Sequence, residues 1–290
     1  WEGVLMTYGK VIELFLVNGT ADSLITAELS NWNGMAVKIP RVELSSCNND
    51  DITKPGVYFL FCKEDDGSDS VYIGEAENVQ ERLKQHVRDY QSEKETYYWN
   101  TAVIFVGRDL NKAMIRYLEN QFVQIARESK RYLVLTKNTY QNTVLKDSQK
   151  AVMEEFIDNV KTLINALGYK VLEPLVQADL PSSKIDDEVL YITSGSVNAR
   201  GMVTSEGFVV LSGTTVNETT AQSLSPGMLK LRKDLLDSTK VENLTTIEDI
   251  LFSSSSAAAD FVLGYSASGP RSWKAKNGRT LKEIEISLSN

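Results

Sequence analysis

The sequence is poor in the residues that build soft metal sites and disulfides. It has two cysteines, Cys47 and Cys62, and a single histidine, His86, in 290 residues. Two thiols in a chain of this size favour reduced, partly buried cysteines, with a disulfide between them as the alternative. Two cysteines and one histidine on separate elements do not make a tetrahedral zinc site, which leaves a hard cation held by oxygen atoms as the metal to consider.

Long apolar runs and excess positive charge are also lacking. No run approaches 18 apolar residues, so no transmembrane helix is predicted, and no charged-then-apolar signal opens the chain. We therefore expect a cytoplasmic protein without membrane contact. The net charge of −8 argues against a long electropositive surface that wraps nucleic acid. Residues 53–142 nevertheless carry 13 Lys/Arg against 13 Asp/Glu, and residues 268–290 carry five against two.

The composition is that of a globular protein with more than one folded part. The length of 290 residues favours two domains, and 42% hydrophobic residues suffice for a sizeable core. We predict an α+β protein in four segments. They are a β-rich N-terminal extension (1–50), a central α+β domain (51–145), a connecting helix and linker (146–185) and a second small α+β domain (186–290).

In the first half, hydrophobic periodicity predicts both strands and helices. The strands are expected at residues 10–17, 25–29, 35–39, 57–62, 71–73 and 101–106, with a strand or loop at 132–135. Helices are expected at residues 77–91 and at 147–167, where Gly168 ends the second helix. Another helix is expected to begin after a cap at Asp109. The acidic, proline-containing stretch that follows is predicted to be the linker between the domains.

In the second half we expect strands at 189–192 and 208–211, with a bend or a tight crossing at Arg200-Gly201. Ser225-Pro226 predicts a helix start, and the serines at 253–256 predict a capped helix that ends at Gly264. Asn277-Gly278 predicts a hairpin turn between residues 273–274 and 280–281. These residues carry no recognisable chemistry of their own.

Six residues of the first half offer two phenols, a guanidinium, an imidazole, a carboxylate and an amide, a set that suits phosphodiester hydrolysis: Tyr58, Tyr72, Arg82, His86, Glu119 and Asn138. Each has a structural alternative when taken alone. A strand tyrosine usually packs in the core, Arg82 and His86 at i and i+4 suit a solvated helix face, and Asn138 suits a turn, with Asn142 as its rival. Helical Glu119 would usually face solvent, but its neighbours place it beside the apolar stripe.

Taken in order, these residues resemble a known family. Gly56-Val57-Tyr58 and Tyr72-Ile73-Gly74, followed in order by the other four residues, resemble the GIY-YIG nuclease superfamily. Arg82 and His86 also have the expected helical spacing. The stretch from Ala199-Arg200-Gly201 to Gly278 resembles a module known as domain of unknown function 4357. The resemblance implies a small mixed or antiparallel three-stranded sheet flanked by helices. It also implies a Mg²⁺-dependent endonuclease, with Mn²⁺ as the alternative ion, acting on DNA, with RNA as the open alternative.

The resemblance also implies a role for each residue. Glu119 would hold the metal ion, Tyr58 would be the general base, and Tyr72 would position the attacking water. Arg82 would grip the scissile phosphate, His86 would share the proton or hold Tyr58, and Asn138 would hold its loop and Glu119 in place.

Two departures from the family pattern stand out. The loop at 64–69 between the tyrosine motifs is long and acidic, and Glu75 stands where many members have lysine. The competing hypothesis is a silent nuclease fold that contacts a protein partner, for example within a restriction or defence system, and a homodimer is a further candidate assembly.

Overall fold

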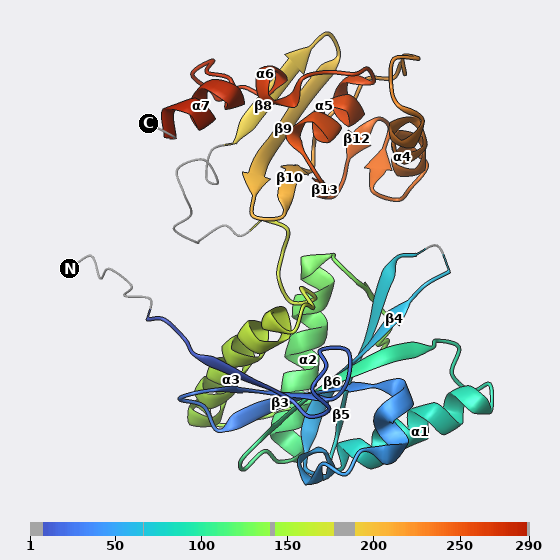
Figure 1. Cartoon of the computed structure of the whole chain (residues 1–290), viewed down its shortest axis with the longest axis vertical. Coiled ribbons are helices and arrows are strands. Elements are labelled where there is room, and N and C mark those ends of the chain that lie inside the picture. Colours follow the sequence, from blue (N-terminus) through green and yellow to red (C-terminus); the bar gives the residue numbers. More distant parts are fainter. Residues whose placement is uncertain (1–7, 66, 140–142, 177–188, 289–290) are drawn as a thin grey trace. The chain divides into compact units, whose positions relative to one another are not determined.

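The structure is a computed structural model that describes residues 8–65, 67–139, 143–176 and 189–288. The chain divides into two compact units, Trp1–Pro174 and Leu175–Asn290, which Figure 1 shows in blue to yellow-green and in yellow to red. The predicted linker residues 177–188 and the rival residue Asn142 lie outside the described residues. The predicted α+β class is confirmed.

One sheet of seven strands forms the centre of the first unit, in the order β1-β2-β3-β6-β4-β5-β7. The strands are β1 (Ile12–Leu16), β2 (Ile25–Leu29), β3 (Gly34–Pro40), β4 (Gly56–Lys63), β5 (Asp69–Ala76), β6 (Trp99–Gly107) and β7 (Leu133–Val134). The expected three strands are β6, β4 and β5, in which the central strand β4 pairs antiparallel with both neighbours. The N-terminal strands extend this same sheet, because β3 pairs with β6 from Gly34↔Gly107 to Pro40↔Thr101. This pairing satisfies the backbone groups that β6 would otherwise expose at an edge.

The described residues of the first unit also form three α-helices and two short 3₁₀ helices: η1 (Arg41–Ser46), η2 (Asp50–Thr53), α1 (Val79–Gln91), α2 (Lys112–Ser129) and α3 (Asp147–Ala166). Asn78 caps α1 by accepting a hydrogen bond from the Glu81 amide. The predicted cap Asp109 is wrong, because the Asn111 side chain caps α2. Asp109 instead takes a left-handed turn conformation with φ 67°, which asparagine and aspartate tolerate better than most residues.

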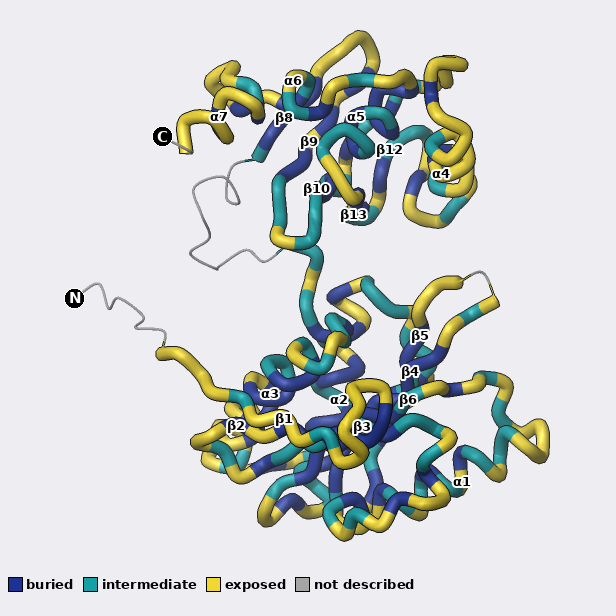
Figure 2. Tube along the Cα trace, viewed as in Figure 1, coloured by how far each residue is buried: buried dark blue, intermediate teal, exposed yellow. Residues whose placement is uncertain are grey.

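Strand β4 supplies side chains to both faces of the sheet, and all but its last residue are buried (Figure 2). Side chains alternate between the two faces of a strand. On one face, Phe59 belongs to the cluster that contains Phe122 of α2 and Phe156 of α3. On the other, Tyr58 belongs to the cluster that contains Leu83 of α1. The same alternation therefore anchors the strand and delivers the Tyr58 phenol to the α1 face.

The two cysteines lie in this second cluster. Both are buried and free, as the reduced-thiol reading predicted.

The second unit contains a four-stranded antiparallel sheet and a two-stranded one. Its elements are β8 (Leu190–Ser194), β9 (Val197–Thr204), β10 (Gly207–Val210), α4 (Pro226–Leu236), β11 (Val241–Glu242), β12 (Thr245–Thr246), β13 (Ile250–Phe252), α5 (Ser255–Leu263), α6 (Gly269–Ser272) and α7 (Leu281–Leu288). Ser225 and Ser254 cap α4 and α5 as predicted.

Two details of the second unit differ from the sequence prediction. Strand β9 runs through Arg200-Gly201 without a bend; the tight-crossing alternative holds, because a Cβ on Gly201 would lie 2.4 Å from the Phe208 ring. The turn at Asn277-Gly278 forms, and Lys274 and Thr280 pair in an antiparallel bridge as the predicted hairpin requires, but Leu281 already begins α7. Within the described residues, no helix has the length and apolar character needed to cross a membrane.

Candidate active site

The centre of the candidate site is a hydrogen bond between Tyr58 and His86. The Tyr58 hydroxyl lies 2.9 Å from Nε2 of His86. Tyr58 comes from β4, and His86 lies three residues after Leu83 on the buried face of α1. Both side chains are removed from solvent, with Tyr58 1% and His86 0% exposed. The i, i+3 spacing on α1 therefore explains why a polar ring is carried into an apolar interface.

Tyr72 of β5 lies beside this pair and is half-buried. Its ring centroid is 5.1 Å from that of His86 and 6.3 Å from that of Tyr58. Gly74 is the cross-strand partner of Tyr58. A Cβ on Gly74 would lie 2.4 Å from the Tyr58 hydroxyl oxygen. The glycine of the second motif thus leaves the space that the first motif's phenol fills.

Arg82, one turn before His86 on α1, supplies positive charge to both phenols. Burial raises the pKa of Tyr58 and of Tyr72, and Arg82 acts in the opposite direction on each. Burial alone would lower the pKa of Arg82, but the two phenols outweigh it and the pKa is raised. The Tyr58 pKa is therefore raised overall, because desolvation of the phenolate exceeds the attraction of Arg82.

Glu119 is the buried carboxylate of the site. It lies on α2, is 7% exposed, and follows Leu118 on the inner stripe. Among the residues that the structure describes, no hydrogen bond or ion pair of its carboxylate is found. Burial, together with the charge of Glu75, raises its pKa to about 7, whereas Lys112, Arg116 and Arg82 act in the opposite direction.

The unusual Glu75 is held by cations of α2. Its carboxylate lies 2.8 Å from Nζ of Lys112 and 3.6 Å from Nε of Arg116. The Glu75 side chain is only 7% exposed. Its charge is therefore largely matched within the fold, while it still repels the neighbouring Glu119.

Sequence reasoning missed two residues that contact His86. Oε1 of Glu95 lies 2.7 Å from Nδ1 of His86, and the Tyr97 hydroxyl lies 3.4 Å from the same nitrogen. Both belong to the segment between α1 and β6. The only signal in the sequence is an acidic residue beside the aromatic run Tyr97-Tyr98-Trp99, and nothing local assigns that run to His86.

Asn138 is placed differently from the other five residues. It is exposed after β7, and within the described part of the chain it has no hydrogen bond or ion pair. The predicted contact with Glu119 is thus not found. Thr136, two residues earlier, anchors the segment instead: its hydroxyl accepts from the Ile73 amide at 2.8 Å and donates to the Ile73 carbonyl at 2.7 Å. Thr136 is a third residue that the sequence did not reveal.

Five of the six predicted residues therefore come together. Tyr58, Tyr72 and His86 are in ring contact, and the charges of Arg82 and Glu119 act on both phenols. No group of three or more His, Cys, Asp or Glu side chains suited to a metal ion is found in the described ranges. Glu119 is a buried carboxylate of this site that could contribute to holding a metal ion.

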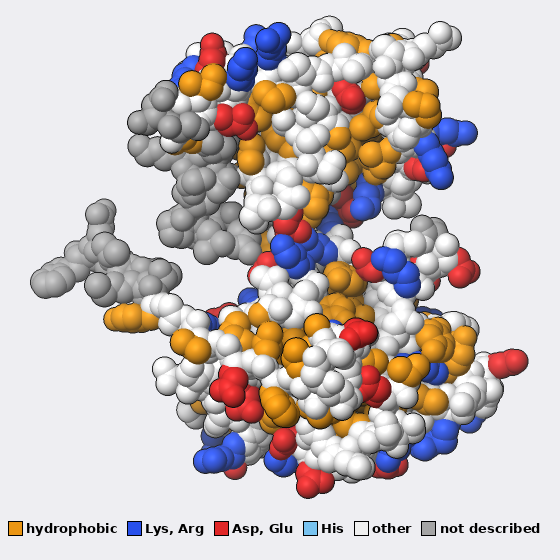
Figure 3. All heavy atoms as spheres, viewed as in Figure 1, with side chains coloured by type: hydrophobic (Ala, Val, Ile, Leu, Met, Phe, Trp, Pro, Cys, Tyr) orange, Lys and Arg blue, Asp and Glu red, His pale blue; other side chains and the backbone are white. Residues whose placement is uncertain are grey.

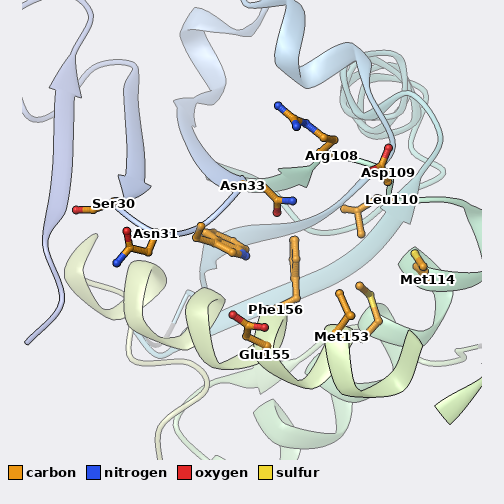
Figure 4. A pocket seen from close by; sticks show the side chains of 12 residues that line it. Ser30, Asn31, Asn33, Arg108, Asp109, Leu110, Met114, Met153, Glu155 and Phe156 are labelled. Carbon is orange, nitrogen blue, oxygen red and sulfur yellow. The ribbon is translucent and has the colours of Figure 1, made fainter. Parts of the chain in front are cut away.

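Other surface features lie apart from this centre. In each unit, Figure 3 shows Lys and Arg side chains interspersed with Asp and Glu on the face in view. Figure 4 shows a hollow beside α3 that is lined by Asn31, Arg108, Phe156 and other residues. None of the six predicted residues lines that hollow.

Comparison with protein families agrees with this geometry. The family model described as GIY-YIG catalytic domain matches residues 54–132, a range that includes Tyr58, Tyr72, Arg82, His86 and Glu119. The model described as Domain of unknown function (DUF4357) matches residues 190–285. No curated protein and no solved structure matches the chain. The match supports a nuclease of the GIY-YIG type with nucleic acid as its substrate, and the chain thus contains a GIY-YIG domain followed by a DUF4357 domain.

Proposed function

We propose that this protein is an endonuclease that uses Mg²⁺ or Mn²⁺ to hydrolyse phosphodiester bonds in DNA. One observation supports it most. The hydrogen-bonded pair Tyr58 and His86 lies close to Arg82 and to the buried carboxylate of Glu119, which has no partner among the described residues. A structural cluster would pair or neutralise such a group. Here the chain keeps Glu119 without a partner among the described residues, next to two phenols and a guanidinium.

Glu119 fits a Mg²⁺ or Mn²⁺ ion. Mg²⁺ typically binds through one or two carboxylates, substrate phosphate oxygens and several waters, so a single protein ligand suffices. A bound ion of this kind polarises the phosphate and stabilises the departing oxygen. The pKa of about 7 means that Glu119 must lose a proton before it can bind a cation. Glu119 is the metal ligand in this proposal.

Tyr58 is the general base. It is the phenol with a proton acceptor within hydrogen-bond distance, at 2.9 Å, whereas Tyr72 is the more exposed of the two. Because burial raises the pKa of Tyr58, the phenol holds its proton in the resting protein. It becomes a base only when His86 takes that proton and when the cation is bound beside the phosphate.

Arg82 and Tyr72 orient the reactants. The guanidinium presents a fork of donors that matches a phosphate, and its half-buried position leaves part of it accessible. Tyr72 stacks beside Tyr58 and would hydrogen-bond the attacking water. Asn138 is proposed as a residue of the outer loop that meets the substrate, since no partner holds it within the described residues.

The second unit is proposed to add DNA affinity or target choice. Its last described elements carry Arg271, Lys274, Lys276, Arg279 and Lys282 against Glu283 and Glu285, a locally basic stretch in an acidic chain. One active site per chain cuts one strand, so double-strand cleavage would need a second copy of the protein or a second encounter.

A plasmid assay tests the proposal. Supercoiled DNA is incubated with Mg²⁺ or with EDTA, beside Glu119→Ala, Tyr58→Phe and the exposed control Tyr98→Phe. We expect nicking by the wild type and Tyr98→Phe with Mg²⁺, and a loss of about 100- to 10,000-fold for Tyr58→Phe. A parallel single-stranded RNA substrate separates the two nucleic acids. Equal silence of all four proteins on both substrates would contradict the proposal and favour a protein-interaction role for the fold.

A further inference from the structure

The contact between Glu95 and His86 sets which ring nitrogen of His86 carries the proton. We propose that Glu95 is a positioning residue that holds His86 as the Nδ1–H tautomer, so that Nε2 is free to accept the Tyr58 proton. This inference rests on the proposed function, because it completes the proton path of the same site. The order of groups is Glu95 Oε1, His86 Nδ1, His86 Nε2 and Tyr58 Oη, joined by distances of 2.7 Å and 2.9 Å.

The protons that each group can donate determine the tautomer of His86. An ionised carboxylate only accepts hydrogen bonds, so Nδ1 beside it must carry a proton. A neutral imidazole carries one proton, and the tautomer is set by the hydrogen bond that the other nitrogen makes. With Nδ1 protonated, Nε2 has a lone pair directed at the Tyr58 hydroxyl. In the other tautomer Nε2–H would donate to that oxygen, and Tyr58 would have no acceptor for its proton.

Burial and nearby positive charge favour a neutral His86 ring. The titratable groups near it include Tyr58, Tyr72, Tyr97, Arg82, Arg41 and Glu95. Burial lowers the pKa of His86 to about 3, and Arg82 and Arg41 add to this effect. The Arg41 guanidinium is fixed 4.4 Å from the centroid of Tyr98 and 4.9 Å from that of Trp99. The ring is thus neutral in the resting protein and can take up a proton only during the reaction.

Glu95 itself is held in the same arrangement. Its pKa is raised, mainly by burial and also by the charge of Asp89, while Arg82, a hydrogen bond from Tyr97 and Arg41 act in the opposite direction. Its side chain is 15% exposed, so the carboxylate is shielded but within reach of these cations. Two cations near one carboxylate favour its ionised, accepting form.

The proton path then balances. As the water attacks phosphorus, its proton passes to the Tyr58 oxygen and the Tyr58 proton passes to Nε2 of His86. The new P–O bond forms while the bond to the leaving oxygen breaks, and that oxygen takes a proton from solvent. The imidazolium, paired with Glu95, returns its proton to solvent and the ring regains the Nδ1–H form.

Because His86 is the only histidine in the sequence, its ring signals need no assignment. The full-length protein, free of any histidine tag, is labelled with ¹⁵N-histidine, and long-range ¹H–¹⁵N correlation identifies the tautomer at pH 7. We expect the Nδ1–H form in the wild type and in Glu95→Gln, whose amide oxygen still accepts. We expect a shift towards the Nε2–H form in Glu95→Ala. Glu93→Gln, an exposed carboxylate in the same segment, is the matched control and should match the wild type.

The kinetic readout uses the same variants. We expect Glu95→Ala to lower kcat about 10- to 100-fold at unchanged KM for DNA, with a smaller loss for Glu95→Gln. Should the alanine variant fail to fold, Glu95→Met fills a similar volume without an acceptor. The inference is overturned if the wild type contains the Nε2–H form of His86 or an imidazolium. It is also overturned if the tautomer stays unchanged in a variant that lacks an acceptor at position 95. The tautomer is measured without substrate. A protein that shows the expected tautomer but no nuclease activity would therefore contradict the proposed function and not the tautomer assignment.

Discussion

Replacing Glu119 with glutamine should stabilise the metal-free protein above neutral pH while abolishing nicking. The folded pKa of about 7 lies above the ordinary value of 4.5. Between these values the folded protein holds a proton that the unfolded chain has lost, so stability falls as pH rises from 4.5 to 7. Above pH 7 the fold carries an ionised, buried carboxylate. Glutamine has the same shape and does not ionise, so the variant is spared this cost.

The size of the effect follows from the shift. A rise of 7 − 4.5 = 2.5 pH units corresponds to a ceiling of about 3 kcal/mol, at about 1.4 kcal/mol for each unit. Partial screening by solvent and the hydrogen-bonding needs of the new amide reduce this to about 1 to 2 kcal/mol. For a unit of this size the melting temperature should rise by about 2 to 8 °C at pH 8, with no difference at pH 4.

Thermal unfolding in EDTA at pH 8 and pH 4 measures this difference, and Glu128→Gln, an exposed carboxylate on the same helix, is the control. Adding Mg²⁺ at pH 8 should raise the melting temperature of the wild type and not that of Glu119→Gln, because only the carboxylate binds the ion. If Glu119→Gln is less stable than the wild type at pH 8, the carboxylate is stabilised by a partner and the reasoning fails.

Three further predictions follow from single contacts. Gly74→Ala should lower the stability of the first unit by about 1 to 3 kcal/mol and remove nicking, because its Cβ would displace the Tyr58 hydroxyl; denaturant melts and the plasmid assay measure both, and an active variant would contradict it. Glu75→Gln should move the acidic limb of the pH–rate profile to lower pH, because Glu75 raises the pKa of Glu119; a shift in the opposite direction would refute the assignment. Arg232→Leu should destabilise the second unit by about 2 to 5 kcal/mol, since the buried guanidinium donates to the carbonyl oxygens of Phe261 and Asn217; urea unfolding of the full chain measures it, and an unchanged midpoint would contradict it.

Much of the candidate site could be predicted because its residues lie on elements with a clear period. Tyr58 alternates with Val57 and Phe59 along β4, and His86 shares a helix face with Leu83. Glu119 was expected beside the inner stripe of α2, and it is buried there. In each case local periodicity sets the direction of the side chain. The resemblance to a family indicates which of these side chains come together in one site.

The contacts that escaped prediction depend on pairings far apart in the sequence. Strand β3 joins the nuclease sheet through β6, about 65 residues later, and no local pattern encodes that register. Thr136 holds Ile73 across 63 residues. The start of α2 also could not be predicted from local sequence. Asp109 and Asn111 are both good capping residues, and the fold determines that Asn111 caps the helix.

Glu75 shows how a departure from a family pattern acquires meaning only in three dimensions. From the sequence, a carboxylate in place of lysine weakens the attraction of the site for phosphate. In the fold, Lys112 and Arg116 lie within 2.8 Å and 3.6 Å of it, so positive charge returns to the same region from α2. The remaining effect of Glu75 falls on Glu119, whose pKa it raises. In the proposed mechanism Glu119 must be ionised to bind a cation, so Glu75 would set the pH above which the ion binds.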